Sequence, residues 1–497
     1  MNKKILFFAL LLSLPLFCTA QEVPMQGLYQ DAQKHLVALL NIDTSQPEPD
    51  ETAAVRYLYK ELNKHGIDWD FLSPHKGRAN LLARIQGSDP QAKPLLLISH
   101  LDTAPAGENW SVPPYKATLL DGKIYGLGAT DAKNYTAAHL AILTHIKAQG
   151  LTPKRDIIFL ATSGEESGSD TGIKWLAETQ WEKINPGYAL NEGGGIIKDT
   201  PGGQPLIFAE AGSKMYMDIK ITATGEAAHS SLPLEENAVY RLSQALAKVQ
   251  NFNPAARLTD TALEFFRKIA PFQEEDAQTT LQLLLLGKDE EKQMAAEIIA
   301  KDPFFCTQLK DTLNPVNISS GTDTGASAAE ASAVLNVRLL PGTDPDEFFE
   351  ELKTFLGEEE HLTLEILERP QLPFPAPMNG EDELFASIER TAQRIWPQSV
   401  SVAGLNPASG DGEFLRRLGV ITYGIGPVMN PQENTPSPHT ADEFISLEDF
   451  EEQVAFMAAV VYDFALDKNI VPPAVTATEQ TTQTEEKNEP ANQTIVP

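Results

Sequence analysis

The sequence predicts an α/β protein, in which a mostly parallel sheet forms one domain and a smaller α+β domain is inserted into it. Short apolar runs alternate with helical patterns near both ends of the chain, as buried parallel strands and their crossover helices do. A middle stretch instead alternates apolar and polar residues, which is typical of half-exposed strands. With 497 residues, the chain is long enough for two or three domains.

Residues 1–20 have the pattern of a secretory signal peptide and are excluded from the fold. Lys3 and Lys4 precede an apolar run too short to span a bilayer, and Thr19 and Ala20 are small residues that suit cleavage after Ala20. We therefore expect an exported protein, periplasmic or secreted.

The first part of the large domain is predicted over residues 21–212. Helical spacing covers 28–40, 51–65 and 132–148, and strand patterns cover 80–85, 94–102, 156–162 and 188–192. The run P-L-L-L-I-S-H-L-D at 94–102 suits a central strand that delivers His100 and Asp102 to the carboxyl edge of the sheet. Ligands of open α/β folds bind at that edge.

The pattern changes after Gly212, and residues 213–370 are predicted to form the inserted domain. Strands at 214–224, 331–340 and 361–367 and helices at 237–249 and 344–356 suggest a ferredoxin-like β-α-β-β-α-β unit. A charged, mostly helical stretch at 252–310 interrupts it. The α/β pattern resumes over 371–467, and the T/E/Q/N/P-rich residues 468–497 are predicted to be a disordered tail.

Charge narrows the possible partners. The net charge of −30 argues against nucleic acid and anionic membrane surfaces. No stretch after residue 20 is long and apolar enough for a transmembrane helix.

Acidic and histidine residues follow the predicted strands of the large domain. Taken singly, each could be a solvated loop residue. Taken together, two histidines and three carboxylates form the ligand inventory of a two-metal site, which favours zinc, with manganese or cobalt tolerated. The five positions are His100, Asp131, the pair Glu165 and Glu166, Glu192 and His439, and the pair would supply one of the ligands. Adjacent carboxylates at 165 and 166 suit one metal ligand and one general base.

Five motifs together resemble the di-zinc aminoacylase/carboxypeptidase family of metallopeptidases, which includes glutamate carboxypeptidase, acetylornithine deacetylase and succinyl-diaminopimelate desuccinylase. The motifs are S-H-L-D at 99–102, G-L-G-A-T-D at 126–131, G-E-E-S-G at 164–168, N-E-G-G at 191–194 and H-T-A-D-E at 439–443. The resemblance covers about residues 26–466, and it implies that the inserted domain serves as a lid or for dimerisation.

The resemblance also implies the metal ligands. His100 and Glu192 would bind one zinc ion, Glu166 and His439 would bind the other, and Asp131 would bridge the two. A cis peptide bond is expected after the bridging aspartate.

Further roles follow from the same resemblance. Asp102 would orient His100, and Glu165 would be the general base. His229, in G-E-A-A-H-S-S-L-P at 225–233, would stabilise the oxyanion, often in the site of a partner subunit. Arg338 would hold the free carboxylate of the substrate.

Two other features bear on the substrate site. S-G-D-G at 409–412 resembles the glycine-rich loop that borders the substrate pocket in the family. Many relatives have K-x-N-V-I-P before the strand that carries Arg338, whose asparagine helps to bind substrate, and here Gly325 falls near the position of that asparagine.

The sequence therefore predicts a secreted zinc exopeptidase or amidohydrolase. A carboxypeptidase that releases a C-terminal amino acid is the leading hypothesis, and an aminoacylase that hydrolyses N-acyl amino acids is the alternative. The expected partners are a small peptide or N-acyl amino acid as substrate and a second copy of the chain, bound through the inserted domain. A non-catalytic zinc-dependent binding protein is disfavoured because no ligand or base is missing. A dinucleotide-binding enzyme is disfavoured because G-L-G-A-T-D lacks the third glycine of that fingerprint.

Overall fold

A computed structural model describes residues 21–22, 25–198, 200, 203–321, 324–357, 359–429, 438–466 and 470–471. The predicted signal peptide lies outside the described residues. So does the predicted tail, except for β19 (Ile470–Val471), which pairs in parallel with β1 (Gln21–Glu22). No helix of the described part is long and apolar enough to cross a membrane.

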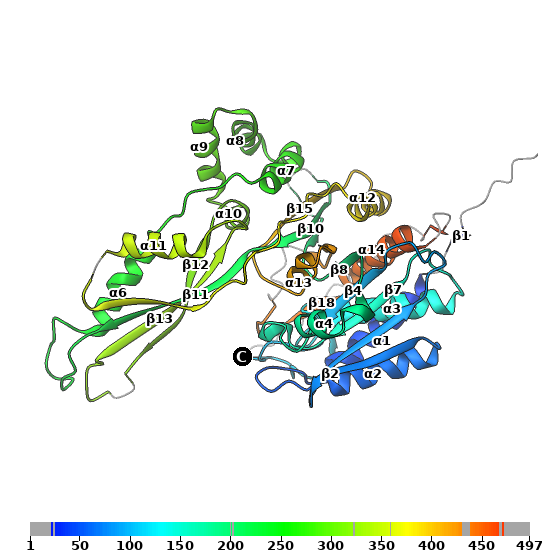
Figure 1. Cartoon of the computed structure of the whole chain (residues 1–497), viewed down its shortest axis with the longest axis horizontal. Helices are drawn as coiled ribbons and strands as arrows, with labels where there is room; N and C mark the ends of the chain where they lie inside the picture. Colours follow the sequence, from blue (N-terminus) through cyan, green and yellow to red (C-terminus); the bar gives the residue numbers. More distant parts are fainter. Residues whose placement is uncertain are drawn as a thin grey trace, which may run out of the picture.

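The described residues form a broad body and a long arm that projects from it (Figure 1). A ten-stranded sheet organises the body, in the order β17-β9-β10-β16-β8-β4-β7-β3-β2, with β15 paired to β10. Its strands are β2 (Asp68–His75), β3 (Arg78–Ile85), β4 (Leu95–His100), β7 (Ile157–Thr162), β8 (Tyr188–Asn191), β9 (Gly195–Ile197), β10 (Leu206–Ser213), β15 (Val400–Asn406), β16 (Ile421–Gly424) and β17 (Val428–Met429).

The centre of this sheet is parallel, as predicted. β4 pairs in parallel with both β7 and β8, and β8 pairs in parallel with β16. Antiparallel pairs occur nearer the edges, for example β2 with β3 and β9 with β10. The predicted fold class is confirmed for this domain.

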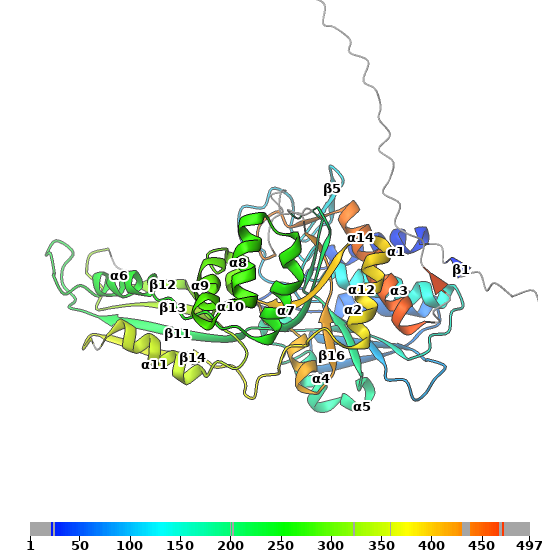
Figure 2. The same ribbon diagram turned by 90° about the horizontal axis from the view of Figure 1, so that it is seen from above.

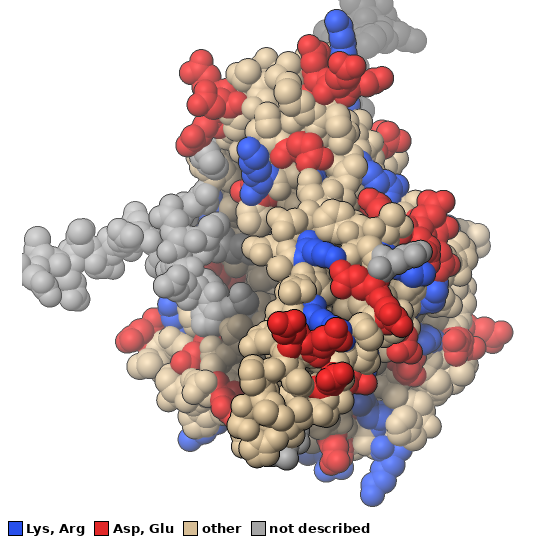
Figure 3. Space-filling view, turned by 90° about the vertical axis from the view of Figure 1, so that its left-hand side faces the viewer, with Lys and Arg blue, Asp and Glu red and all other residues tan. Residues whose placement is uncertain are grey.

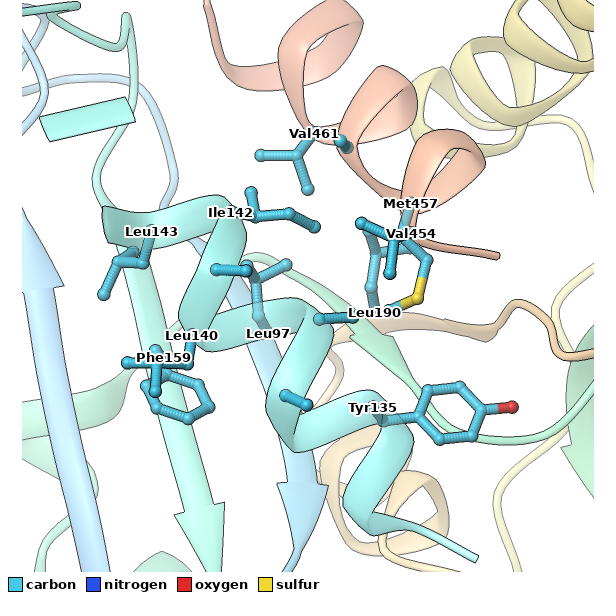
Figure 4. Packing of buried hydrophobic residues seen from close by; sticks show 14 of the residues in the cluster. Leu97, Tyr135, Leu140, Ile142, Leu143, Phe159, Leu190, Val454, Met457 and Val461 are labelled. Atoms are coloured by element: carbon cyan, nitrogen blue, oxygen red, sulfur yellow. The ribbon is translucent and has the colours of Figure 1, made fainter. Parts of the chain in front are cut away.

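Helices cover both faces of the large sheet. They are α1 (Gln26–Leu40), α2 (Thr52–Lys64), α3 (Lys133–Ala148), α4 (Ile173–Thr179), α5 (Trp181–Ile184), α12 (Glu383–Ile395), α13 (Gly412–Arg417) and α14 (Leu447–Ala465). All six residues of β4 are buried, and its side chains alternate between two cores. Leu97 joins α3 and α14 on one face, where Ile142, Met457 and Val461 also pack (Figure 4).

The arm is the inserted unit. Its antiparallel sheet has the order β12-β13-β11-β14, from β12 (Thr312–Ser320), β13 (Glu330–Leu339), β11 (Met215–Thr224) and β14 (Leu362–Glu368). β11 alternates buried and half-buried residues, and the buried ones pack with α6 (Ala238–Val249) and α11 (Pro345–Leu356). This is the predicted β-α-β-β-α-β order, and Figure 2 shows the arm extending away from the body.

The helical stretch forms α7 (Asp260–Ile269), α8 (Glu275–Leu286), α9 (Asp289–Ile299) and α10 (Pro303–Leu309). Although it interrupts the inserted unit in sequence, its apolar side chains share a core with the large sheet. Phe265 and Phe266 of α7 cluster with Phe208 of β10 and Val402 of β15. The stretch is therefore fixed to the body rather than to the arm.

A small sheet closes the body beside the strand ends. It pairs β5 (Thr118–Leu120), β6 (Lys123–Tyr125) and β18 (Phe444–Ser446). Figure 3 looks at the end of the molecule that carries the arm, where basic side chains are scattered among acidic ones and form no continuous patch in the described part of that face.

Candidate metal centre

Three neighbouring strands deliver the first candidate residues. β8, β4 and β7 lie side by side in parallel register, with Leu95 opposite both Tyr188 and Ile157. Their carboxyl ends therefore meet at one edge of the sheet. His100 is the last residue of β4, the turn that holds Glu165 and Glu166 follows β7, and Glu192 follows β8.

Two further residues reach this edge from outside the three strands. Asp131 precedes α3 after the glycine-rich turn, and the peptide bond between Asp131 and Ala132 is cis, as the resemblance implied. His439 lies before β18 in a left-handed backbone conformation, with φ of 67°. Because β18 pairs with β6, which leads into the glycine-rich turn, the segments of Asp131 and His439 lie together.

The five predicted ligands converge in two overlapping sets. Nε2 of His100 lies 3.0 Å from Asp131 Oδ1 and 3.0 Å from Glu192 Oε2. Nε2 of His439 lies 3.2 Å from Asp131 Oδ2 and 3.1 Å from Glu166 Oε1. Asp131 thus offers one carboxylate oxygen to each set, which is the arrangement expected of a bridging residue. Each set could hold a metal ion, since its ligand atoms lie within 4.8 Å of one another.

The chemistry of this group also fits cations. Oε2 of Glu192 is buried, and Nε2 of His100, which also faces Asp131, lies 3.0 Å from it. Burial raises the pKa of Glu192 to about 7 and the pKa of Glu165 well above its usual range. Hydrogen bonds to Asp131 and Glu166 raise the pKa of His439 to about 10. Carboxylates this close together repel unless a positive partner stands among them, and imidazole with carboxylate is a ligand set that zinc accepts.

Asp102 connects the ligand strand to the Glu165 turn. Nδ1 of His100 lies 2.8 Å from the backbone oxygen of Asp102 and 3.7 Å from its carboxylate. The carboxylate instead accepts hydrogen bonds from the backbone N–H of Glu165, at 3.1 Å, and from Nε2 of Gln46, at 3.1 Å. Asp102 therefore holds the imidazole mainly through its backbone oxygen.

Glu165 lies where a general base would be needed. A carboxylate oxygen of Glu165 lies within 4.8 Å of ligand atoms of His100 and Glu166. The turn begins at Gly164, whose φ is 77°, and a Cβ at that position would lie 2.3 Å from Oγ1 of Thr171. A side chain would therefore strain the turn that presents Glu165.

The structure separates the two predicted residues of the arm. Arg338 lies at the body end of β13, where its Nη1 donates a hydrogen bond to Oγ of Ser409 at 3.3 Å and its guanidinium stacks on Tyr216. His229 follows the far end of β11, with Nδ1 2.9 Å from Oγ of Ser231. Ten residues of β11 span about 30 Å. Hence His229 does not meet the five converging residues within this chain.

Glu443 is a residue whose contacts we did not anticipate, although the motif H-T-A-D-E contains it. Its carboxylate accepts hydrogen bonds from the backbone N–H of Gly128, at 3.1 Å, and from the backbone N–H and hydroxyl of Thr130, at 2.7 and 2.8 Å. Glu443 thus ties the residues just before Asp131 to the segment just after His439. Its distance from those residues in sequence is why spacing gave no signal for this link.

Asp411 has a similar position in the glycine-rich loop. Its buried carboxylate accepts hydrogen bonds from Thr162, at the end of β7, and from Ser169, just after the Glu165 turn. The loop is therefore attached to the segment that carries the candidate base.

A cavity of about 720 Å³ opens at this edge of the sheet. Asp131, Glu165, Glu166, Glu192 and His439 all line it. Ser409, the partner of Arg338, lines it as well, so the guanidinium lies at the rim of the cavity.

Comparison with known proteins identifies the family. The model of Peptidase family M20/M25/M40 matches residues 96–463. A probable succinyl-diaminopimelate desuccinylase of Staphylococcus aureus strain MSSA476 is 28% identical over 410 residues, which cover 80% of this chain and 88% of that protein. The human N-fatty-acyl-amino acid synthase/hydrolase PM20D1 is 24% identical over 400 residues, which cover 78% of each chain.

Solved structures show the same fold. An M20 family metallo-carboxypeptidase from Sulfolobus solfataricus superposes with a TM-score of 0.62 at 19% identity, covering 87% of this chain and 98% of that one. Human carnosine dipeptidase 1 superposes with a TM-score of 0.60 at 15% identity, covering 88% and 98%. The family model spans most of the chain, so this chain belongs to the peptidase family M20/M25/M40 and is a hydrolase of the metallopeptidase and amidohydrolase type.

Proposed function

We propose that the chain is an exported di-zinc exopeptidase that releases a C-terminal amino acid from small peptides. The observation that carries this proposal is the double use of Asp131, whose two oxygens lie 3.0 and 3.2 Å from the imidazoles of two ligand sets. His100 and Glu192 would hold one ion, and Glu166 and His439 would hold the other. When bound, such ions would supply Lewis-acid activation of the attacking water and of the substrate carbonyl.

Glu165 would move the proton in this reaction. Its carboxylate is held beside the ligand group, where it can take a proton from the attacking water and return it to the leaving amine. The amide C–N bond breaks, the carbonyl carbon gains the hydroxyl group of the water, and the amine leaves with the proton that Glu165 returns. Burial raises the pKa of Glu165, which favours its uptake of that proton.

The position of Arg338 supports a free carboxylate on the amine half of the substrate. Its guanidinium is anchored by Oδ1 of Asn336 at 3.0 Å and by Ser409 at 3.3 Å, and it lies at the rim of the cavity. A planar guanidinium can bind a carboxylate through two parallel hydrogen bonds. The leaving amino acid would therefore bear a free carboxylate.

Aminoacylase action on N-acyl amino acids is the second candidate, because it uses the same groups and cleaves the same bond. The relatives named for succinyl-diaminopimelate and for N-fatty-acyl-amino acids also favour it. Export is supported by the signal-peptide pattern of residues 1–20. His229 would complete the site from a second copy of the chain.

The test is turnover of N-blocked dipeptides and of N-acetyl amino acids that share the same C-terminal residue. We expect hydrolysis that a chelator abolishes and that zinc restores, with two metal ions bound per chain. Faster cleavage of the dipeptides would support the carboxypeptidase, and faster cleavage of the acetyl compounds would support the aminoacylase. Failure to cleave either series with both ions bound would contradict the proposal. Amino-terminal sequencing of the exported chain would test cleavage after Ala20.

A further inference from the structure

Two walls of the cavity differ in chemistry. One wall includes Ser409, which contacts Arg338 and so belongs to the side assigned to the amine half of the substrate. Another wall is apolar, with Pro427 and Val428 at β17 and Phe444 and Ile445 on β18. A substrate whose carboxylate is held at Arg338 would direct the other half of the amide away from Ser409 and along the apolar wall.

Neither Lys nor Arg is among the described residues that line the cavity. Apart from the carboxylates of the metal centre, the described lining includes the acids Glu210 and Asp449. The described lining therefore offers apolar surface and neither Lys nor Arg to pair with an anionic acyl group.

Cations near the described lining are already engaged. Nζ of Lys123 lies 4.0 Å from the centroid of the Phe444 ring. Nη2 of Arg416 lies 2.6 Å from Oε2 of Glu210, and both side chains are buried. Nζ of Lys198 lies 2.9 Å from Glu452 and 3.8 Å from Asp449. An anionic group entering this part of the cavity would have to break such a pair or remain without a cationic side chain to pair with, and both are costly.

We propose that the enzyme selects an apolar group on the acyl side of the scissile amide and excludes an anionic one such as a succinyl group. The inference rests on the proposed function for the position of the amine half at Arg338. It applies to the acyl group of an N-acyl amino acid and equally to the penultimate residue of a peptide. Hydrophobic contact with Val428, Phe444 and Ile445 would stabilise the bound acyl group.

The test compares two substrates that differ in one group. N-succinyl-L-alanine has a carboxylate where N-(4-methylpentanoyl)-L-alanine has an isopropyl group, and the two are otherwise alike in shape. With the zinc-loaded enzyme, we expect kcat/KM to favour the isopropyl compound by about 100-fold or more. Equal values, or a preference for the succinyl compound, would overturn the inference.

A binding measurement separates this inference from the proposed function. Calorimetry with the zinc-loaded E165Q protein should show the same order of affinities. If neither compound is hydrolysed by the unmodified enzyme but the isopropyl compound binds more tightly, the proposed function fails and the inference holds. If both are hydrolysed but without the preference, the inference fails and the function holds.

A substitution in the apolar wall tests the cause of the preference. Val428→Lys would place a cation among the described lining residues and should reduce the preference for the isopropyl compound at least about tenfold. Val428→Ile keeps the wall apolar and should leave the preference within about threefold of the original. A V428K enzyme that still cleaves the isopropyl compound with an unchanged preference would contradict the inference.

Discussion

The edge of the large sheet and the far end of the arm differ in whether the fold of one chain brings their candidate functional residues together. At the sheet edge, residues from five segments converge, and ligand atoms within each set lie within 4.8 Å of one another. At the far end of the arm, His229 is exposed on a loop, and Nδ1 of its ring hydrogen-bonds to the neighbouring Ser231. The fold of one chain therefore assembles the metal centre, whereas His229 requires either a movement of the arm or a second chain.

The largest expected loss of activity concerns Glu165, which lies in the turn after β7 at the edge of the large sheet. Glu165→Gln keeps the shape of the side chain but removes its ability to take a proton. We expect kcat to fall about 10³-fold, within the range for loss of a general base. Metal content, measured by elemental analysis, should stay at two ions per chain, because Glu165 is not assigned as a ligand. A loss of metal in E165Q would instead show that Glu165 is a ligand and would contradict its assigned role.

Substitution of His229 should have the next largest effect on kcat. It is also the most direct test of the contrast between the sheet edge and the far end of the arm. His229→Ala removes the donor assigned to the oxyanion, so we expect kcat to fall about 10²-fold while metal content and thermal stability are unchanged. Kinetics and unfolding of the purified variant measure both.

Mixing the E165Q and H229A variants tests whether His229 acts in the site of its own chain or in that of a partner chain. If His229 completes the site of a partner, an H229A chain paired with an E165Q chain forms one intact site, since the first supplies Glu165 and the second supplies His229. We expect turnover to reappear on mixing under conditions that exchange subunits. An absence of any gain, with exchange verified, would mean that the arm must bring His229 to its own chain.

A smaller effect is expected at Glu443, which no ligand set contains. Glu443→Gln places an amide group against the N–H of Gly128 or Thr130 and so disrupts the link between the segments of Asp131 and His439. Loss of such supporting contacts lowers metal affinity about 10- to 100-fold. Competition with a chromogenic chelator measures it.

The adjacent Asp442 provides the matched control. Asp442→Asn removes the same charge one residue away but keeps an acceptor for the backbone N–H of Ser111. We expect metal affinity to remain within about twofold of the original. Equal losses in both variants would mean that charge, and not the contacts of Glu443, determines the affinity.

Much of the metal centre could be predicted because parallel strands bring their carboxyl ends to one edge. The apolar run of β4 locates His100 without any knowledge of its neighbours, and the same rule places Glu165 and Glu192. The contacts of Glu443 and Asp411 could not be predicted, since they join residues hundreds of positions apart and no periodic pattern marks them. The core of α7 was not anticipated for a related reason: its helical spacing predicts an apolar face but does not say which sheet will cover it.

The smallest effect on metal retention is expected from a substitution in the apolar core of the arm. Leu335 of β13 is fully buried against α6 and α11, and Leu97 of β4 is fully buried beneath α3. Truncation of either side chain to alanine should lower the free energy of unfolding by about 2–5 kcal/mol. Because Leu97 lies three residues before His100, L97A should also weaken metal retention, whereas L335A should leave it within about twofold. Denaturant unfolding and chelator competition on both variants measure the two quantities, and a loss of metal from L335A equal to that from L97A would show that the arm and the sheet edge are not independent.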